Sequence, residues 1–182
     1  CYYCACNKII TKRKEKAEPY LDTLFKEIEM RAQGYDRNKP IEQLHWGGGT
    51  PTFISHDQMT ALMNKLRQHF NLLETDDRDY SIEIDPRELQ PDTLAHLKSI
   101  GFNRVSLGVQ DFEEKVQIAV NRVQPYEMTR DTLQQARDLG FKSINIDLIY
   151  GLPFQSRESF ARTLNTVLEL SPDRLSVFNY AH

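Results

Sequence analysis

Apolar residues recur along the chain in two alternating patterns, one with the period of a helix and one with the period of a strand. The first helical pattern is Leu21, Leu24, Phe25 and Ile28, at positions i, i+3, i+4 and i+7. It follows Pro19, a residue favoured in the first turn of a helix. The pattern therefore predicts an amphipathic helix shortly after the N-terminus.

Similar spacing predicts four more helices. The second begins at Ser55, because Ser55 and Gln58 have the spacing of a capping box. Its apolar face consists of Met59, Leu62, Met63, Leu66 and Phe70. The others are predicted at residues 91–99, 126–139 and 156–170. In the last of these, the residues expected to face the core are Phe160, Leu164, Val167 and Leu168.

Short runs rich in β-branched residues, bounded by Gly, Pro or Asp, lie between the helices. They predict strands at residues 43–46, 80–84, 104–109, 143–149 and 174–178. Their centres are about 20 to 40 residues apart, the spacing of parallel strands joined by helical crossovers. The sequence thus predicts an α/β fold with a parallel sheet.

Polar residues stand at the carboxyl end of each predicted strand. In order along the chain they are the segment GGGTP at residues 47–51, Glu83 with Asp85, Gln110 with Asp111, Asp147 with Tyr150, and Asn179 with Tyr180 and His182. The carboxyl ends of parallel strands lie at one edge of a sheet, where barrel-like α/β folds bind their ligands. We therefore expect one shared pocket there. We assign no chemistry to His45 or Trp46, which we expect to pack at the end of the first strand.

Composition limits the possible functions. The 182 residues are 40% hydrophobic, enough for one sizeable core, and we treat residues 1–182 as a single domain. A net charge of −3 gives little support to nucleic-acid binding. No apolar run approaches the roughly 20 residues that span a bilayer, and no signal peptide is evident. The absence of cysteine after position 6 suits a reducing compartment, so we expect a cytoplasmic protein.

Basic residues crowd the segment that follows the cysteines. They are Lys8, Lys12, Arg13, Lys14 and Lys16. Such a run is usually a solvated loop, but it could also receive an anionic substrate or an acidic electron donor.

The three cysteines of the chain are Cys1, Cys4 and Cys6. Two thiolates three positions apart on a loop can bind one soft metal centre. A zinc site or unliganded thiols are the alternatives, but zinc prefers four protein ligands and the five histidines show no paired spacing to complete such a set. The motif therefore favours an iron–sulfur cluster.

Three further features suggest ligand binding. Residues 47–51 allow close approach of a backbone to an anion or an amino-acid group, unless they form only a flexible loop. Glu83 and Asp147 stand where carboxylates accept hydrogen bonds from ribose hydroxyls, although either could instead cap the core. Arg122, in a segment between helices, could clamp a carboxylate or be solvated.

With these segments the chain resembles the radical S-adenosylmethionine enzymes and, within them, the family of oxygen-independent coproporphyrinogen III oxidases, or coproporphyrinogen dehydrogenases. The matching segments extend along the whole chain. They are CYYCAC (1–6), LHWGGGTPT (44–52), SIEIDPRE (81–88), GFNRVSLGVQDF (101–112), NIDLIYGLP (145–153) and DRLSVFNYAH (173–182).

The resemblance implies a partial (β/α)6 TIM-like barrel, with the first strand, the closing elements and a C-terminal domain outside these residues. It implies a [4Fe-4S] cluster and two molecules of S-adenosylmethionine. The cluster cleaves the molecule bound to it to give a 5'-deoxyadenosyl radical. The radical drives the anaerobic oxidative decarboxylation of coproporphyrinogen III to protoporphyrinogen IX in heme biosynthesis. The implied partners are this substrate and an electron donor protein, and the full-length enzyme is expected to be a monomer.

The resemblance also implies roles for individual residues, although it identifies no catalytic residue. Cys1 and Cys4 correspond to the second and third cluster ligands of the CxxxCxxC motif, whose first cysteine would precede Cys1, and Cys6 is an additional cysteine that is not a ligand. The first S-adenosylmethionine would contact Gly48, Gly49, Thr50 and Glu83. The second would contact Gln110, Arg122, Asp147, Ala181 and the backbone near Tyr3. Phe178 would flank the adenine.

Two other functions remain open at this point. One is that of the heme-trafficking relatives in the same superfamily, which bind S-adenosylmethionine and heme but make no porphyrin. An aromatic residue usually occupies the position of Cys6 in those relatives, so Cys6 favours the oxidase. The other alternative is a non-catalytic metal- or heme-binding module.

Overall fold

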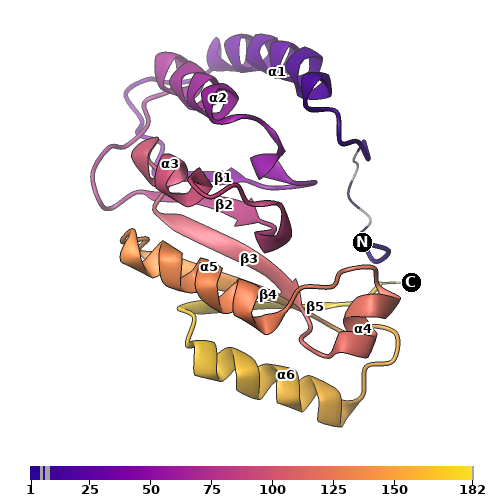
Figure 1. Ribbon diagram of the computed structural model, residues 1–182. Helices are drawn as coiled ribbons and strands as arrows, with labels where there is room; N and C mark the ends of the chain where they lie inside the picture. Colours follow the sequence, from indigo (N-terminus) through magenta and orange to yellow (C-terminus); the bar gives the residue numbers. More distant parts are fainter. Residues whose placement is uncertain (5, 7–8, 182) are drawn as a thin grey trace.

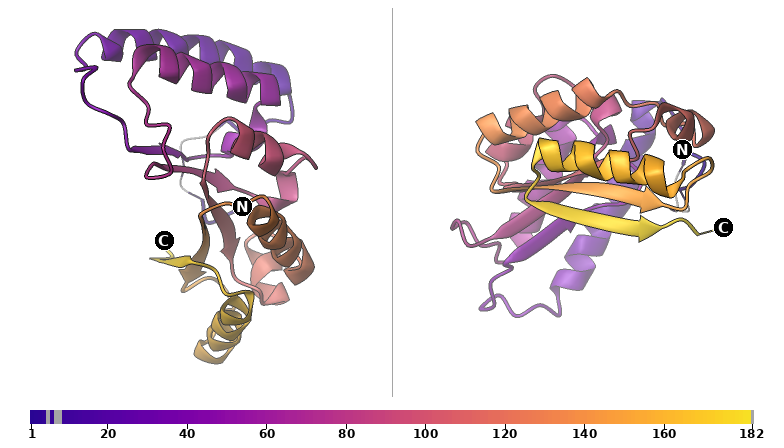
Figure 2. Two further views of the ribbon diagram at one scale, coloured as in Figure 1. Left: turned by 90° about the vertical axis from the view of Figure 1, so that its left-hand side faces the viewer. Right: turned by 90° about the horizontal axis from the view of Figure 1, so that it is seen from below.

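Five parallel strands form a single curved sheet in the computed structural model, which describes residues 1–4, 6 and 9–181. The strands lie side by side in chain order, β1-β2-β3-β4-β5. Their bounds are Gln43–Trp46 (β1), Asp79–Ile84 (β2), Arg104–Gln110 (β3), Ser143–Tyr150 (β4) and Arg174–Asn179 (β5). The result is an open half-barrel, which confirms the predicted partial barrel of parallel strands (Figures 1 and 2).

Helices cover the outer side of the sheet (Figures 1 and 2). The α-helices are α1 (Ala17–Ala32), α2 (His56–His69), α3 (Thr93–Ser99), α4 (Glu114–Ala119), α5 (Tyr126–Asp138) and α6 (Arg157–Leu170). The short 3-10 helices are η1 (Lys14–Lys16), η2 (Pro51–Phe53) and η3 (Pro86–Glu88). Of the described helices, none is both long enough and apolar enough to cross a membrane.

The strands are two-sided because alternate side chains point to opposite faces. On β2, Tyr80, Ile82 and Ile84 are buried, whereas Ser81 and Glu83 between them are partly exposed. The buried set packs in the main hydrophobic core together with side chains of the helices. The apolar core therefore lies between the sheet and the helices, and polar side chains occupy the concave inner face.

The predicted elements agree closely with the structure. Each strand begins and ends within one residue of its predicted bounds. The capping box of Ser55 and Gln58 is present at the start of α2. A second capping box, between Ser156 and Ser159, begins α6. Helix α4 was not predicted, because its six residues are too few to show a clear helical period.

One prediction about helix packing was wrong. Leu168 was expected to face the core, but it is 67% exposed. The buried residues of α6 are Ser159, Thr163, Val167 and Leu170, so the buried face is rotated away from Leu168. Two hydroxyl side chains belong to that face because they make hydrogen bonds there. Thr163 Oγ1 donates to Asp111 Oδ1 over 2.7 Å, which an apolar criterion could not anticipate.

Candidate functional site

A cavity of about 530 Å³ lies on the inner face of the half-barrel, and all five strands contribute to its wall. It brings together three of the predicted site residues, Glu83, Asp147 and Phe178. The other polar groups of the wall include His45, Ser81, Ser106, Asn145 and Ser176. The cavity therefore offers both hydrogen-bond donors and acceptors, with the half-exposed ring of Phe178 at its edge.

Glu83 connects the second strand to the glycine-rich loop. The backbone N–H of Gly48 donates to Glu83 Oε2 over 3.0 Å. His45 Nε2 lies 3.5 Å from Glu83 Oε1, and His45 Nδ1 is 2.7 Å from Ser81 Oγ. His45 thus lines the cavity, whereas it was expected merely to pack at the strand end. Trp46 is buried as expected, with its ring 4.9 Å from that of Phe102.

Gly48 has a backbone conformation that favours glycine, with φ of +85°. A Cβ at Gly48 would meet no atom within 4 Å, so replacement tests the backbone conformation alone. Gly48→Ala is expected to lower the free energy of unfolding by about 1–2 kcal/mol, because side chains disfavour positive φ. Urea denaturation measures this change.

Gly34→Ala is the matched control, since its Cβ would also meet nothing within 4 Å and its φ lies outside the left-handed region. It should change the free energy of unfolding by no more than about 0.5 kcal/mol. Equal effects of the two substitutions would contradict the strain assigned to Gly48.

Asp147 is held on the inner face by neighbouring strands. Ser106 Oγ donates to Asp147 Oδ2 over 2.8 Å, and Asn145 Nδ2 donates to Asp147 Oδ1 over 2.7 Å. Burial raises the pKa of the Asp147 carboxyl above its ordinary value, although the hydrogen bonds from Ser106, Ser176 and Asn145 oppose the change. Asp147 therefore binds a proton more readily than an exposed aspartate does.

This raised pKa has a definite effect on stability. The folded state binds the Asp147 proton more tightly than the unfolded state does. Protonation of Asp147 therefore contributes to the free energy of unfolding, and this contribution is fully present below the unfolded pKa of about 3.9. It is lost as pH rises through the folded pKa. Asp147→Asn should therefore raise the free energy of unfolding at pH 7, by up to about 1 kcal/mol, and change it little at pH 3. A uniform loss of stability at both pH values, in urea titrations, would contradict this.

The cysteine segment lies beside the carboxyl ends of the strands, where Figure 1 shows the N-terminus. The backbone N–H of Tyr2 donates to the carbonyl of Val120 over 2.9 Å, which ties the segment to the end of α4. Tyr3 packs against a small apolar cluster that also contacts Tyr180. Burial raises the pKa of the Tyr3 phenol, while the charges of Arg122 and Arg87 oppose that rise.

Arg122 and Asp85 form the centre of a buried charged network at this edge. Arg122 is only 6% exposed, and its Nη1 donates to Asp85 Oδ2 over 3.0 Å. Its Nη2 donates to the carbonyl of Gly108, close to the side chain of Gln110. Arg87 donates to the same Asp85 carboxylate from the other side. Arg122 is therefore a buried, fixed cation and not a solvated side chain.

Both guanidinium groups also reach Cys1. Arg87 Nη2 lies 3.4 Å from Cys1 Sγ, and Arg122 Nη1 lies 3.6 Å from it. Burial alone would raise the pKa of Asp85, but the hydrogen bonds and charges of Arg87 and Arg122 outweigh it and hold that pKa below its ordinary value. Asp85 is thus an anion that joins the two cations beside the thiol.

The thiols fit part of an iron–sulfur ligand set. Cys1 and Cys4 are half-buried, whereas Cys6 is exposed. Soft sulfur donors next to cationic groups suit a cluster, whose ligated form carries negative charge. Within residues 1–4, 6 and 9–181, no group of three or more Cys, His, Asp or Glu side chains could hold a metal ion.

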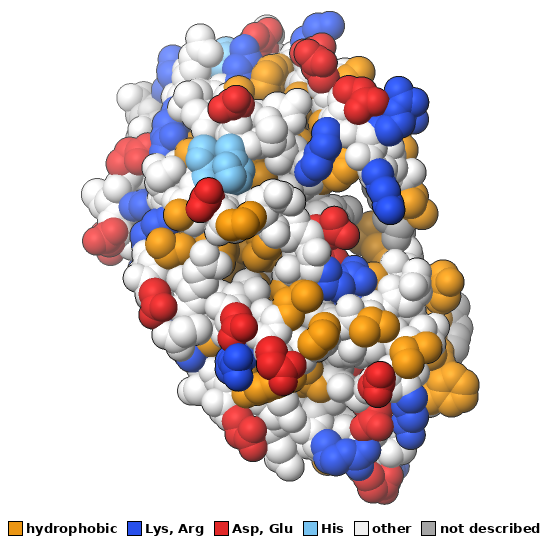
Figure 3. All heavy atoms as spheres, in the orientation of Figure 1, with side chains coloured by type: hydrophobic (Ala, Val, Ile, Leu, Met, Phe, Trp, Pro, Cys, Tyr) orange, Lys and Arg blue, Asp and Glu red, His pale blue; other side chains and the backbone are white. Residues whose placement is uncertain are grey.

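The remaining predicted residues lie around the same edge. Gly49 is exposed and Thr50 is half-buried in the loop after β1, while Ala181 follows β5. Lys12, Arg13, Lys14 and Lys16 are exposed, as expected of a solvated run, and Lys14 lies 4.6 Å from the centre of the Phe53 ring. Figure 3 shows Lys and Arg side chains gathered on this side of the molecule, near the start of α1. Lys8 and His182 lie outside the described residues.

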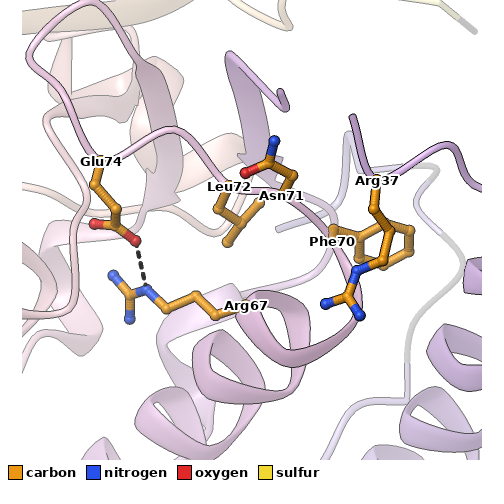
Figure 4. A pocket seen from close by; sticks show the side chains of 6 residues that line it. All are labelled: Arg37, Arg67, Phe70, Asn71, Leu72 and Glu74. Carbon is orange, nitrogen blue, oxygen red and sulfur yellow. Dashed lines mark hydrogen bonds and ion pairs between the residues drawn. The ribbon is translucent and has the colours of Figure 1, made fainter. Parts of the chain in front are cut away.

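A second hollow, of about 340 Å³, lies near the end of α2 and the loop that leads to β2. Its lining residues are Arg37, Arg67, Phe70, Asn71, Leu72 and Glu74 (Figure 4). Arg67 Nε donates to Glu74 Oε1 over 2.9 Å across its wall. Because it precedes β2 in the chain, it belongs to the amino ends of the strands, away from the predicted site.

Sequence reasoning missed several residues that shape the site. Arg87 was not singled out, and Asp85 was noted only as a strand-end acid. Ser106 and Asn145 were missed, although Asn145 is two residues before Asp147 and so must share its face of the strand. The same period of two places Ser81 beside Glu83. Counting back by two from Glu83 and from Asp147 could have found Ser81 and Asn145, but not Ser106 or the contacts of Arg87.

Comparisons with known proteins show which proteins this chain is similar to. The oxygen-independent coproporphyrinogen III oxidase of Pseudomonas aeruginosa is 58% identical over all 182 residues. A solved structure, described as coproporphyrinogen III oxidase from Escherichia coli and as a radical SAM enzyme, is 54% identical over the whole chain, with a TM-score of 0.93. The chain spans only about 40% of the first protein and 41% of the second.

More distant structures share the fold alone. The radical S-adenosylmethionine methyltransferase TsrM from Kitasatospora setae is 15% identical, with a TM-score of 0.63 over 87% of this chain.

A family model described as the radical SAM superfamily matches residues 1–167. This match includes the cysteine segment, the glycine-rich loop and the acids at the strand ends. The chain therefore belongs to the radical SAM superfamily.

Proposed function

We propose that residues 1–182 form the core barrel of an oxygen-independent coproporphyrinogen III oxidase, which decarboxylates coproporphyrinogen III to protoporphyrinogen IX without oxygen. The observation that carries this proposal is the 54–58% identity over the entire chain to proteins of that name. The TsrM methyltransferase and the archaeal Elp3, which share a similar fold, are only 15% and 17% identical to this chain. The enzyme would act in heme biosynthesis in the cytoplasm.

The cofactors of the superfamily are a [4Fe-4S] cluster and S-adenosylmethionine, and when bound they supply the 5'-deoxyadenosyl radical that attacks a substrate propionate. Cys1 and Cys4 would ligate the cluster. Gly48, Gly49 and Thr50 would bind the first S-adenosylmethionine through backbone groups and a hydroxyl, next to Glu83. The contact between Gly48 and Glu83 supports this, because it aligns loop and acid before any ligand arrives.

A second S-adenosylmethionine would use the groups on the remaining strands. Its proposed contacts are Gln110, Arg122, Asp147, Ala181 and the backbone near Tyr3, with Phe178 flanking an adenine. Arg122 suits a carboxylate because it is a fixed, buried cation with an Nε that makes no hydrogen bond among the described residues. Asp147 suits hydroxyl groups because its carboxylate is already ordered by two donors.

The rest of the proposal concerns partners. The substrate would enter at the strand-exit edge, and the polar inner face would hold it. A reduced electron donor protein would approach the cysteine segment, where the adjacent basic run offers a surface of opposite charge to an acidic donor. We expect the full-length enzyme to act as a monomer.

Product analysis tests this proposal. A protein of the relatives' full length that carries these 182 residues would be incubated anaerobically with coproporphyrinogen III, S-adenosylmethionine and a chemical reductant. The expected result is protoporphyrinogen IX with two molecules of carbon dioxide released per substrate. Heme capture without decarboxylation would identify a trafficking protein instead. A colourless protein with tightly bound zinc would identify a non-catalytic module.

A further inference from the structure

Arg87 is a residue to which the proposed function gives no task. It belongs to η3, directly after β2, and it is joined to Asp85 by two hydrogen bonds, from Nε over 2.9 Å and from Nη2 over 2.6 Å. This two-pronged contact fixes the plane of the guanidinium group. The hydrogen bonds of Asp85 also raise the pKa of Arg87, so its charge is permanent.

The same guanidinium group contacts the cysteine segment. Its Nη2 lies 3.4 Å from Cys1 Sγ, although 86 positions separate the two residues in the chain. Arg87 is a quarter exposed, which leaves little room for other orientations of the side chain. The strand exit therefore directs one N–H donor at the first thiol of the motif.

We propose that Arg87, held by Asp85, is a positioning residue that fixes Cys1 at the rim and raises the reduction potential of a cluster bound there. This inference rests on the proposed function, because it requires Cys1 to be a cluster ligand. A ligating thiolate still accepts hydrogen bonds, and such bonds are one way in which proteins set cluster potentials. A positive charge beside the sulfur favours the reduced, more negative cluster.

Arg122 does not make Arg87 redundant. Arg122 Nη1 is the more distant donor to Cys1, at 3.6 Å, and it is also committed to Asp85. Its Nη2 is committed to the carbonyl of Gly108. Arg87 therefore supplies the shorter hydrogen bond to the thiol, and its loss cannot be replaced without rearrangement of Arg122.

The test is a redox titration of the reconstituted cluster, followed by electron paramagnetic resonance, in a protein of the relatives' full length that carries this chain. Arg87→Met should lower the equilibrium constant for reduction about tenfold, which is about 59 mV for one electron. Arg87→Lys, which keeps the charge but loses the two-pronged contact, should cause a smaller decrease. Arg162→Met removes an exposed arginine paired with Glu113 on the surface and should leave the potential unchanged.

The outcomes separate this inference from the proposed function. If the unmodified protein binds no cluster, the proposed function fails as well. If it binds a cluster and Arg87→Met has an unchanged potential, only the role of Arg87 is overturned. If Arg87→Met loses its iron, hydrogen exchange of the Tyr2 amide is compared between the variants and the unmodified apo-protein. Faster exchange in Arg87→Met that Arg87→Lys reverses supports the positioning role. Unchanged exchange overturns that role.

Discussion

Cys4→Ser is expected to abolish cluster loading and turnover, whereas Cys6→Ser should leave both close to the values of the unmodified protein. Cys4 is half-buried in the segment tied to Val120, and serine is a poor replacement for a thiolate ligand of iron. Cys6 is exposed, and the proposed function gives it no ligand role. Iron and sulfide content, with the absorbance of the cluster, measures loading in both variants.

The two substitutions are matched because each exchanges sulfur for oxygen two residues apart in the same segment. Anaerobic assays with coproporphyrinogen III then report turnover for the same samples. Full cluster content in Cys4→Ser would exclude Cys4 as a ligand. Loss of the cluster in Cys6→Ser would show that the assignment of ligands along the segment is shifted.

Asp85→Ala is expected to lower the free energy of unfolding by about 3 kcal/mol at pH 7, because it leaves Arg122 buried without its carboxylate. The side chain of Arg122 is 7% exposed and that of Asp85 is 14% exposed, so water cannot replace the lost partner easily. Two guanidinium groups would also face each other across the gap. Urea denaturation measures the loss.

The effect should depend on pH, since the folded pKa of Asp85 is lowered. The carboxylate contributes stability that is fully present above the unfolded pKa of about 3.9 and is lost as pH falls through the folded pKa. The difference between Asp85→Ala and the unmodified chain should therefore shrink in acid. Asp76→Ala is the control, because Asp76 is fully exposed and forms a long ion pair, with its Oδ1 3.8 Å from Arg78 Nη1. A comparable loss in Asp76→Ala would show that the burial of Asp85 is unimportant.

The fold was largely predictable because its signals are local. Strand alternation, Pro19 and the capping box of Ser55 each describe a few neighbouring residues, and the structure contains the elements they predict. The exceptions have separate causes, and the missed helix α4 was too short to show a period. Leu168 is exposed because the buried face of α6 includes Thr163, whose hydroxyl donates a hydrogen bond to Asp111, and is rotated away from Leu168.

The site was only partly predictable. Parallel strands bring their carboxyl ends to one edge, so the proximity of Gly48 to Glu83 follows from topology. The contacts of Cys1 do not, because they depend on how a loop of irregular backbone lies over η3 and the segment after α4. Arg87 and Arg122 are 86 and 121 positions from Cys1, and contacts between such distant residues produce no periodic pattern in a single sequence.

The two-sided sheet separates the groups that stabilise the fold from those that contact ligands. Because the main apolar core lies on the helix side, occupation of the concave side adds to stability by mass action without repacking that core. Substitutions on the inner wall can therefore alter which molecules are held there at little cost to folding. This scaffold is suited to changes of specificity, since its chemistry and its cohesion reside on opposite faces.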